Sequence, residues 1–285
     1  MHLSYDWNGK MRRALLLLLL GLSLSCICLP SPAWQDQNPL GMAFAYSDLT
    51  GARLLSVDTP VNSAALVKAV FAEGLTLNVK FLRQQKSAAN WNGRQTARDF
   101  DQSAGSLFQV EGGKTIMGKE ASIGEECLLV TEQFLRERKR LSVRSDPTIH
   151  TSDALLRRVE RAKGKKVSWE GSIARIGATG ELILVRFIPD GKTCLASLVL
   201  VTPDSIAFDD YEAKYDADVK GFVWRVDTDG IDAESFHVLA AFEGKQGIEI
   251  AVLWDASEGQ DLYLLRSEGA ALRPLFRSYR YCAPI

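Results

Sequence analysis

The sequence predicts an α+β fold, mainly antiparallel β-sheet with a few helices. Apolar runs of strand length are separated by turn residues, a hairpin signal lies at 181–201, and three segments carry apolar residues at helical spacing. The 285 residues are 46% hydrophobic, so the chain can bury a large core in one or two domains.

Residues 1–33 are expected to be a signal peptide rather than part of this fold. A basic start at Arg12 and Arg13 precedes the apolar run 14–29, and small residues lead to Ala33, where we expect cleavage. The sequence therefore predicts an exported protein, periplasmic or extracellular and possibly envelope-associated.

A membrane anchor and a lipoprotein are the alternatives to simple export. The apolar run has 16 residues, fewer than the roughly 20 that span a bilayer. Lipidation at Cys26 or Cys28 would normally require a leucine three residues earlier, where this chain has serines. We therefore favour a chain with no transmembrane segment after cleavage, and Met11 is a candidate true start.

Residues 34–146 are expected to form an N-terminal β-rich domain. The spacing of apolar residues becomes helical at 62–73, which predicts a helix there. Asn62 can cap its start and Gly74 can end it. The polar stretch 83–105 predicts a surface loop or a mobile helix. The expected strands are 41–46, 52–57, 75–82, 106–113 and 125–135.

Residues 147–285 are expected to form a C-terminal α+β domain that begins at Pro147 and is built on the hairpin. Thr151 or Ser152 caps a helix that ends at Gly164 and buries a stripe including Leu155 and Val159. A second helix is expected after Asp232, ending at Gly244. The remaining strands are 166–177, 222–226, 248–254, 261–266 and 274–281.

The hairpin at 181–201 is expected at the centre of the fold. A proline, an aspartate and a glycine at 189–191 suit a tight turn between two apolar runs. Only Arg186 and Ser197 interrupt faces that are otherwise apolar on both sides of these runs. A half-solvated strand would alternate apolar and polar residues, so we expect both faces to be covered.

Carboxylate groups offer two candidate sites, each with a simpler interpretation. Asp227, Asp229 and Asp232 surround Gly230, but the glycine comes too early for a calcium loop and no glutamate ends it. A turn and a helix cap explain these three aspartates, so we expect no metal and no cofactor.

Asp209, Asp210 and Glu212 could serve a hydrolase, but a solvated loop explains these carboxylates better.

Nucleophilic catalysis has little support in the sequence. Only His150 and His237 remain after cleavage, and no hydrolase, metalloprotease or nucleotide-binding motif accompanies them. The three remaining cysteines, an odd number, allow at most one internal disulfide and suit buried apolar positions.

Charge is distributed unevenly along the chain. Residues 131–166 carry a net charge of +6 and residues 204–268 carry −11. The basic segment could bind an anionic polymer, a lipid surface or a protein partner, although mutual neutralisation within the fold is the favoured explanation. No overall positive charge suggests nucleic acid. The candidate binding residues are Arg157, Arg158, Arg161 and Lys163.

The function predicted from the sequence is an exported, non-catalytic globular protein that acts as a binding or envelope-associated module of unknown ligand. The alternative is an extracytoplasmic hydrolase that uses carboxylates near Asp209, Asp210 and Glu212. Missing catalytic motifs favour the binding module over an enzyme.

Overall fold

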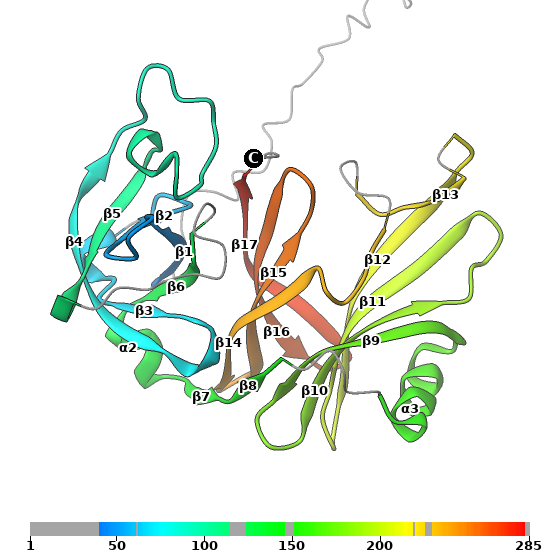
Figure 1. Ribbon diagram of the computed structural model, residues 1–285. Helices are drawn as coiled ribbons and strands as arrows, with labels where there is room; N and C mark the ends of the chain where they lie inside the picture. The colour runs from blue at the N-terminus through cyan, green and yellow to red at the C-terminus, as the bar shows by residue number, and fades with distance from the viewer. Residues whose placement is uncertain are drawn as a thin grey trace, which may run out of the picture. The chain divides into compact units, whose positions relative to one another are not determined.

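The computed structural model describes residues 40–60, 62–113, 124–145, 151–218, 220–225 and 230–282. The expected signal peptide, the boundary at Pro147 and the residues His150, Asp227 and Asp229 lie outside these ranges. Figure 1 shows two β-sheets connected in sequence.

The described residues form a nearly all-β protein, so the predicted α+β class is wrong. Seventeen strands are accompanied by only two α-helices, α2 at Glu132–Arg136 and α3 at Asp153–Lys163. The two predicted helices at 62–73 and 232–244 account for most of the error. The first segment forms the short strand β3 between two 3₁₀ turns, Ser63–Ala65 and Ala72–Gly74, and the second forms strand β14.

The first sheet is a closed barrel in the order β1-β2-β5-β4-β3-β6. Its strand β4 alternates as the sequence predicts: Leu77 and Val79 are buried, whereas Asn78 and Lys80 are exposed. The bounds are β1 Met42–Ser47, β2 Arg53–Ser56, β3 Lys68–Val70, β4 Thr76–Gln85, β5 Gly105–Val110 and β6 Glu126–Val130.

Strand β3 replaces the helix that was predicted over 62–73. Its short run pairs with β4 on one side and with β6 on the other, and so closes the barrel. Ala69 packs in the barrel core, whereas Val70 packs in a second core shared with the other sheet. Both faces of this strand are therefore apolar. Because neighbouring residues are then both apolar, the sequence lacks the alternation of a strand and was interpreted as a helix.

The second sheet has the order β7-β14-β15-β16-β17-β12-β11-β10-β9-β8, with β13 paired to β12. Its two edge strands, β7 Lys139–Leu141 and β8 Val143–Arg144, are separated by Ser142 alone. One short segment therefore forms both edges, and the sheet curls round on itself. The other strands are β9 Val167–Ile176, β10 Gly180–Phe187, β11 Thr193–Val201, β12 Ile206–Asp216, β13 Gly221–Val223, β14 Phe236–Gly244, β15 Gly247–Asp255, β16 Gly259–Glu268 and β17 Ala271–Tyr281.

The predicted hairpin is confirmed as β10 and β11, with both faces covered. Leu184 and Leu198 pair with each other and belong to the core inside the curled sheet. On the other face Val185 and Val199 pack with Val159 of α3. The cap of α3 is also confirmed, because Ser152 Oγ accepts from Leu155 N at 3.3 Å.

Strand β14 replaces the helix that was predicted after Asp232. Asp232 instead caps a turn, since its Oδ1 accepts from Ser235 N at 2.9 Å. Val238 packs inside the second sheet, whereas Leu239 and Phe242 pack in the core shared with the first sheet. Apolar residues on both faces and a bulge between Val238 and Ala240 gave this strand its helix-like spacing.

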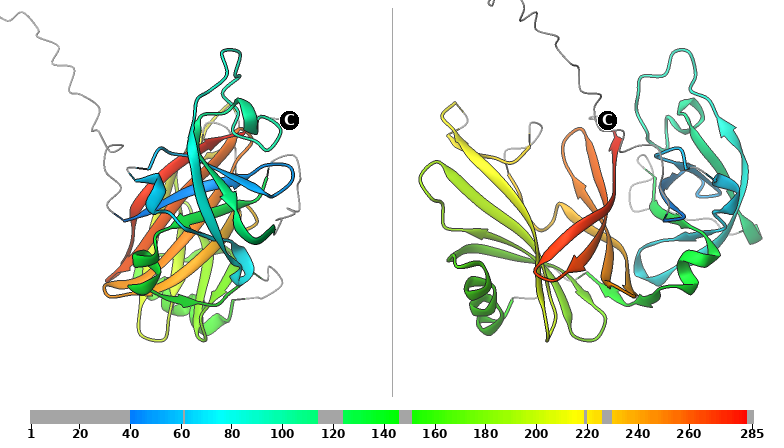
Figure 2. Two further views of the ribbon diagram at one scale, coloured as in Figure 1. Left: turned by 90° about the vertical axis from the view of Figure 1, so that its left-hand side faces the viewer. Right: turned by 180° about the vertical axis from the view of Figure 1, so that it is seen from behind.

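Strand β12 replaces the acidic loop expected around Asp209. It pairs with β11 along its length but with β17 only at Phe208 and Ala271. Beyond that point β12 pairs with β13, and Figure 2 shows β12 and β17 diverging. The inner face of the sheet therefore has an open end, near which β13 lies.

Candidate ligand pocket at the open end of the second sheet

Strand register places four side chains in one row on the inner face of the second sheet. Trp169 of β9 is opposite Arg186 of β10, which is opposite Ala196 of β11, which is opposite Tyr211 of β12. The next row inward contains Gly171, Leu184, Leu198 and Asp209. Arg186 therefore sits where the apolar interior meets the open end.

Arg186 lies over an aromatic ring and has no acceptor for its Nε among the described residues. Its Cζ lies 4.5 Å from the centroid of the Trp169 ring. Its Nε is buried without a hydrogen-bond partner, and within the described part of the chain the side chain forms no ion pair. Gly171 makes room for this stack, since a Cβ there would lie 2.8 Å from the Trp169 ring.

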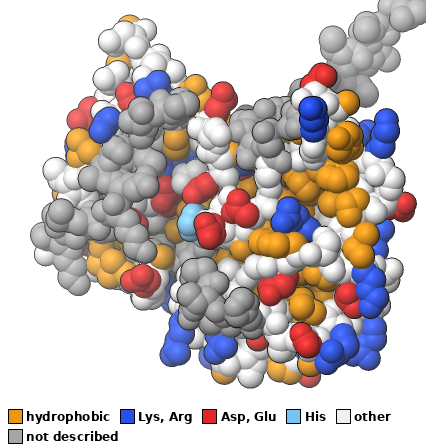
Figure 3. Space-filling model, turned by 45° about the vertical axis from the view of Figure 1, so that its right-hand side comes forward, with side chains coloured by type: hydrophobic (Ala, Val, Ile, Leu, Met, Phe, Trp, Pro, Cys, Tyr) orange, Lys and Arg blue, Asp and Glu red, His pale blue; other side chains and the backbone are white. Residues whose placement is uncertain are grey.

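Trp224, directly after β13, supplies a second buried donor without an acceptor. Its Nε1 has no hydrogen-bond partner, and its ring packs against Phe222 with centroids 6.2 Å apart. Trp169, Arg186, Phe222 and Trp224, with Ser168, Pro189, Cys194 and Gly230, line a pocket of about 440 Å³, hereafter the aromatic pocket. Figure 3 shows hydrophobic side chains gathered on the surface of the second sheet, with a lysine or arginine among them.

A polar cluster deeper along the same inner face is satisfied internally. Tyr211 Oη donates to Asp209 Oδ2 at 2.7 Å, and Arg277 donates to Tyr263 Oη at 3.1 Å. Asp261 binds Arg277 at 3.5 Å. Burial raises the pKa values of Asp209, Tyr211 and Tyr263, so that both phenols stay protonated.

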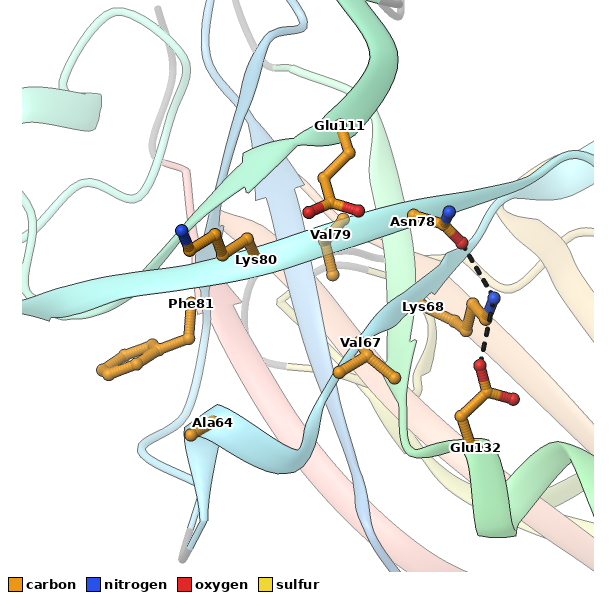
Figure 4. A pocket seen from close by; sticks show the side chains of 9 residues that line it. All are labelled: Ala64, Val67, Lys68, Asn78, Val79, Lys80, Phe81, Glu111 and Glu132. Carbon is orange, nitrogen blue, oxygen red and sulfur yellow. Dashed lines mark hydrogen bonds and ion pairs between the residues drawn. The ribbon is translucent and has the colours of Figure 1, made fainter.

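A groove on the first sheet has polar groups that already bind one another. Figure 4 shows Lys68 between Asn78 and Glu132, with Nζ 2.8 Å from Asn78 Oδ1 and 3.1 Å from Glu132 Oε1. The groove has a volume of about 480 Å³ and is also lined by Glu111. Lys68, Asn78 and Glu132 therefore satisfy one another, and no buried donor without an acceptor lines this groove among the described residues.

The four basic residues predicted to bind an anionic partner lie on α3, and two of them, Arg158 and Lys163, bind groups outside the helix. Arg158 donates to the carbonyls of Thr202 and Pro203 at 2.9 and 3.1 Å. Lys163 binds Asp210 and lies 4.7 Å from the Phe208 ring. The other two residues, Arg157 and Arg161, are exposed and line a groove of about 470 Å³. An anionic partner at this surface stays a prediction.

The carboxylates predicted for a hydrolase lie on opposite faces of one strand. Asp209 points to the inner face with Tyr211, whereas Asp210 accepts from Ser197 Oγ at 2.6 Å on the outer face. Glu212 is exposed, and its strand position places it on the face of Asp210. None of these three carboxylates lines the aromatic pocket. The hydrolase stays an untested alternative.

The other sequence candidates are dispersed. His237 is on strand β14, with Nε2 2.9 Å from Asp255 Oδ2. Cys127, Cys194 and Cys282 are all buried and free. No group of three or more potential metal ligands occurs among the described residues, and no described helix is long and apolar enough to cross a membrane.

Sequence reasoning missed the aromatic pocket, although one signal was visible. Arg186 interrupts a strand face that is otherwise apolar, and such a position requires either a partner or a ligand. Trp224 and Phe222 carried no comparable signal, because only the fold brings β13 to the end of β9 and β10.

No protein-family model, curated protein or solved structure matches this chain. The chemistry of the aromatic pocket is therefore the main support for a functional conclusion.

Proposed function

We propose that this chain is an exported, non-catalytic binding protein whose ligand occupies the aromatic pocket. One observation carries the proposal: Arg186 and Trp224 line the same pocket, and each has a buried N–H, Nε and Nε1, without an acceptor among the described residues. An unsatisfied buried polar group costs about 1–3 kcal/mol, and a ligand with acceptor atoms removes that cost.

Binding suits the pocket better than catalysis. The described residues of its lining include no histidine, aspartate or glutamate that could act as a general acid or base. Burial raises the pKa of the Cys194 thiol, although Arg186 opposes this, so the reactive thiolate is disfavoured. Three aromatic rings and one guanidinium are typical of recognition by packing and hydrogen bonding.

Binding to the pocket can be tested with 8-anilinonaphthalene-1-sulfonate, a flat anionic dye. We expect one dye to bind per chain with enhanced fluorescence. Trp169→Ala should weaken binding about tenfold or more, the effect of losing ~1.4 kcal/mol, because it removes one wall and the support of Arg186.

Leu82→Ala is the matched control for the dye experiment, since Leu82 is an exposed hydrophobic residue on the first sheet. It should leave the dye affinity unchanged. Circular dichroism must show that both variants are folded. Equal dye binding by the wild type and the folded Trp169→Ala variant would contradict the proposed function.

Export predicts a defined mature chain that starts at Trp34. The intact mass of protein from the exported fraction should equal that of residues 34–285. A double variant, Cys26→Ser with Cys28→Ser, should be processed identically. A mass that retains residues 11–33, or a lipid adduct on Cys26, would refute this form of export.

A further inference from the structure

We propose that the ligand of the aromatic pocket is a carboxylate attached to a six-membered ring, bound through Arg186 and Trp224. This inference rests on the binding function proposed above and names its ligand class. It depends on the charge of the pocket, the number of free donors and the shape of the lining.

The charge of the pocket requires an anion. Among the described residues, Arg186 is the only charged residue in the lining. Two other partly buried arginines have carboxylate partners: Arg225 lies 3.1 Å from Asp261, and Arg266 lies 2.8 Å from Glu249. Arg186 lacks such a partner among the described residues, and a ligand carboxylate would supply it.

The donors suit a single negative charge. The Arg186 guanidinium lies over the Trp169 ring, and a guanidinium presents N–H groups in a planar fork, the geometry that a carboxylate accepts. Trp224 adds one neutral donor. A phosphate dianion would receive only one compensating charge, so a monoanion is better matched.

The lining favours a flat ring as the body of the ligand. The rings of Trp169, Phe222 and Trp224 offer apolar faces, against which an aromatic ring or the face of a sugar ring can pack. The volume of about 440 Å³ lies within the range of small-molecule sites. An aromatic acid and a hexuronic acid share this chemistry.

Displacement of the bound dye by small acids tests the ligand class. We expect benzoate or glucuronate to displace the dye and to raise the melting temperature of the wild type. Their uncharged counterparts, benzamide and glucose, and inorganic phosphate should have at least about tenfold weaker effects. The benzoate and glucuronate arms distinguish an aromatic acid from an acidic sugar.

Two variants separate a binding role from a structural one. Arg186→Met should abolish displacement by the acids yet keep or raise the melting temperature of the free protein, because it removes a partly buried unpaired charge. Trp224→Phe keeps an aromatic ring but loses the N–H, so it should weaken acid binding severalfold. Arg157→Met, at an exposed cation on α3, should change neither property.

The outcomes distinguish the two proposals. If the dye binds but neither acid displaces it more strongly than its uncharged counterpart, the ligand class is wrong and the binding function stands. If the dye does not bind to the pocket at all, both proposals fail. A large fall in the melting temperature of Arg186→Met would show that Arg186 serves the fold.

Discussion

Leu198→Asp is expected to yield no soluble folded protein. Leu198 is fully buried in the inner core of the second sheet, opposite Leu184 on one side and Asp209 on the other. Loss of its buried apolar surface costs about 1.5–3 kcal/mol. An ionised carboxylate without a partner costs several kcal/mol more, and the total approaches a typical folding free energy of about 5–15 kcal/mol.

The neighbour of Leu198 makes this substitution worse. Burial already raises the pKa of Asp209, with a further contribution from Asp210, so this region disfavours negative charge. A new carboxylate directly across the ladder would add like-charge repulsion. Soluble yield and a thermal melt by circular dichroism measure the effect.

Two variants control for the site and for its charge. Leu198→Ala should fold with a loss of about 2–5 kcal/mol, the usual range for a cavity. Asp209→Asn should be nearly neutral at pH 7 or slightly stabilising. Because the pKa of Asp209 is raised in the folded state, the protonated carboxyl stabilises the fold at low pH. That contribution to stability is lost as the pH rises through the folded-state pKa. Equal yields and melting temperatures for wild type and Leu198→Asp would show that Leu198 is not central.

Arg280→Met is expected to lower the free energy of unfolding by about 3–5 kcal/mol, the range for breaking a buried ion pair. Arg280 of β17 is fully buried and binds Glu126 of β6. It also donates to the carbonyl of Gln95 at 2.7 Å and lies 4.2 Å from the Tyr46 ring. One side chain from the last strand therefore joins three segments of the first sheet region.

The same strand offers a control for this prediction. Arg273 is largely exposed and lies 3.6 Å from Glu268, so Arg273→Met should cost no more than about 1 kcal/mol. Arg280→Lys should fall between the two, because lysine keeps the charge but cannot reproduce the planar set of donors. Urea unfolding midpoints measure all three. A similar loss for Arg280→Met and Arg273→Met would show that the buried network contributes little.

Elements defined by neighbouring residues could be predicted from the sequence. The hairpin of β10 and β11 needs only the turn at 189–191, and α3 carries its own caps at Ser152 and Gly164. Strand β4 shows its alternation directly. These signals are local, so no knowledge of the rest of the fold was needed.

Elements defined by distant contacts could not be predicted. Strands β3 and β14 each lie between two cores, so both of their faces are apolar and the alternation that marks a strand is lost. Strand β12 is acidic, but Asp210 is neutralised by Lys163 and Asp209 is bonded by Tyr211. Charge alone suggested a loop there, because Lys163 comes from α3 and the bond from Tyr211 to Asp209 forms only once the segment is a strand.

The curling of the second sheet onto a single short segment has a kinetic consequence. Leu141 of β7 pairs with Ala241, whereas Val143 of β8 pairs with Ile176, so closure requires both β14 and β9 to be in place. Arg138 and Glu249, which meet beside this closure at 2.6 Å, are 111 residues apart. Pairings between such distant residues form slowly, since the intervening chain must first be ordered. Until they form, the nascent sheet carries two open edges, and this interval is when it is most exposed to pairing with another chain.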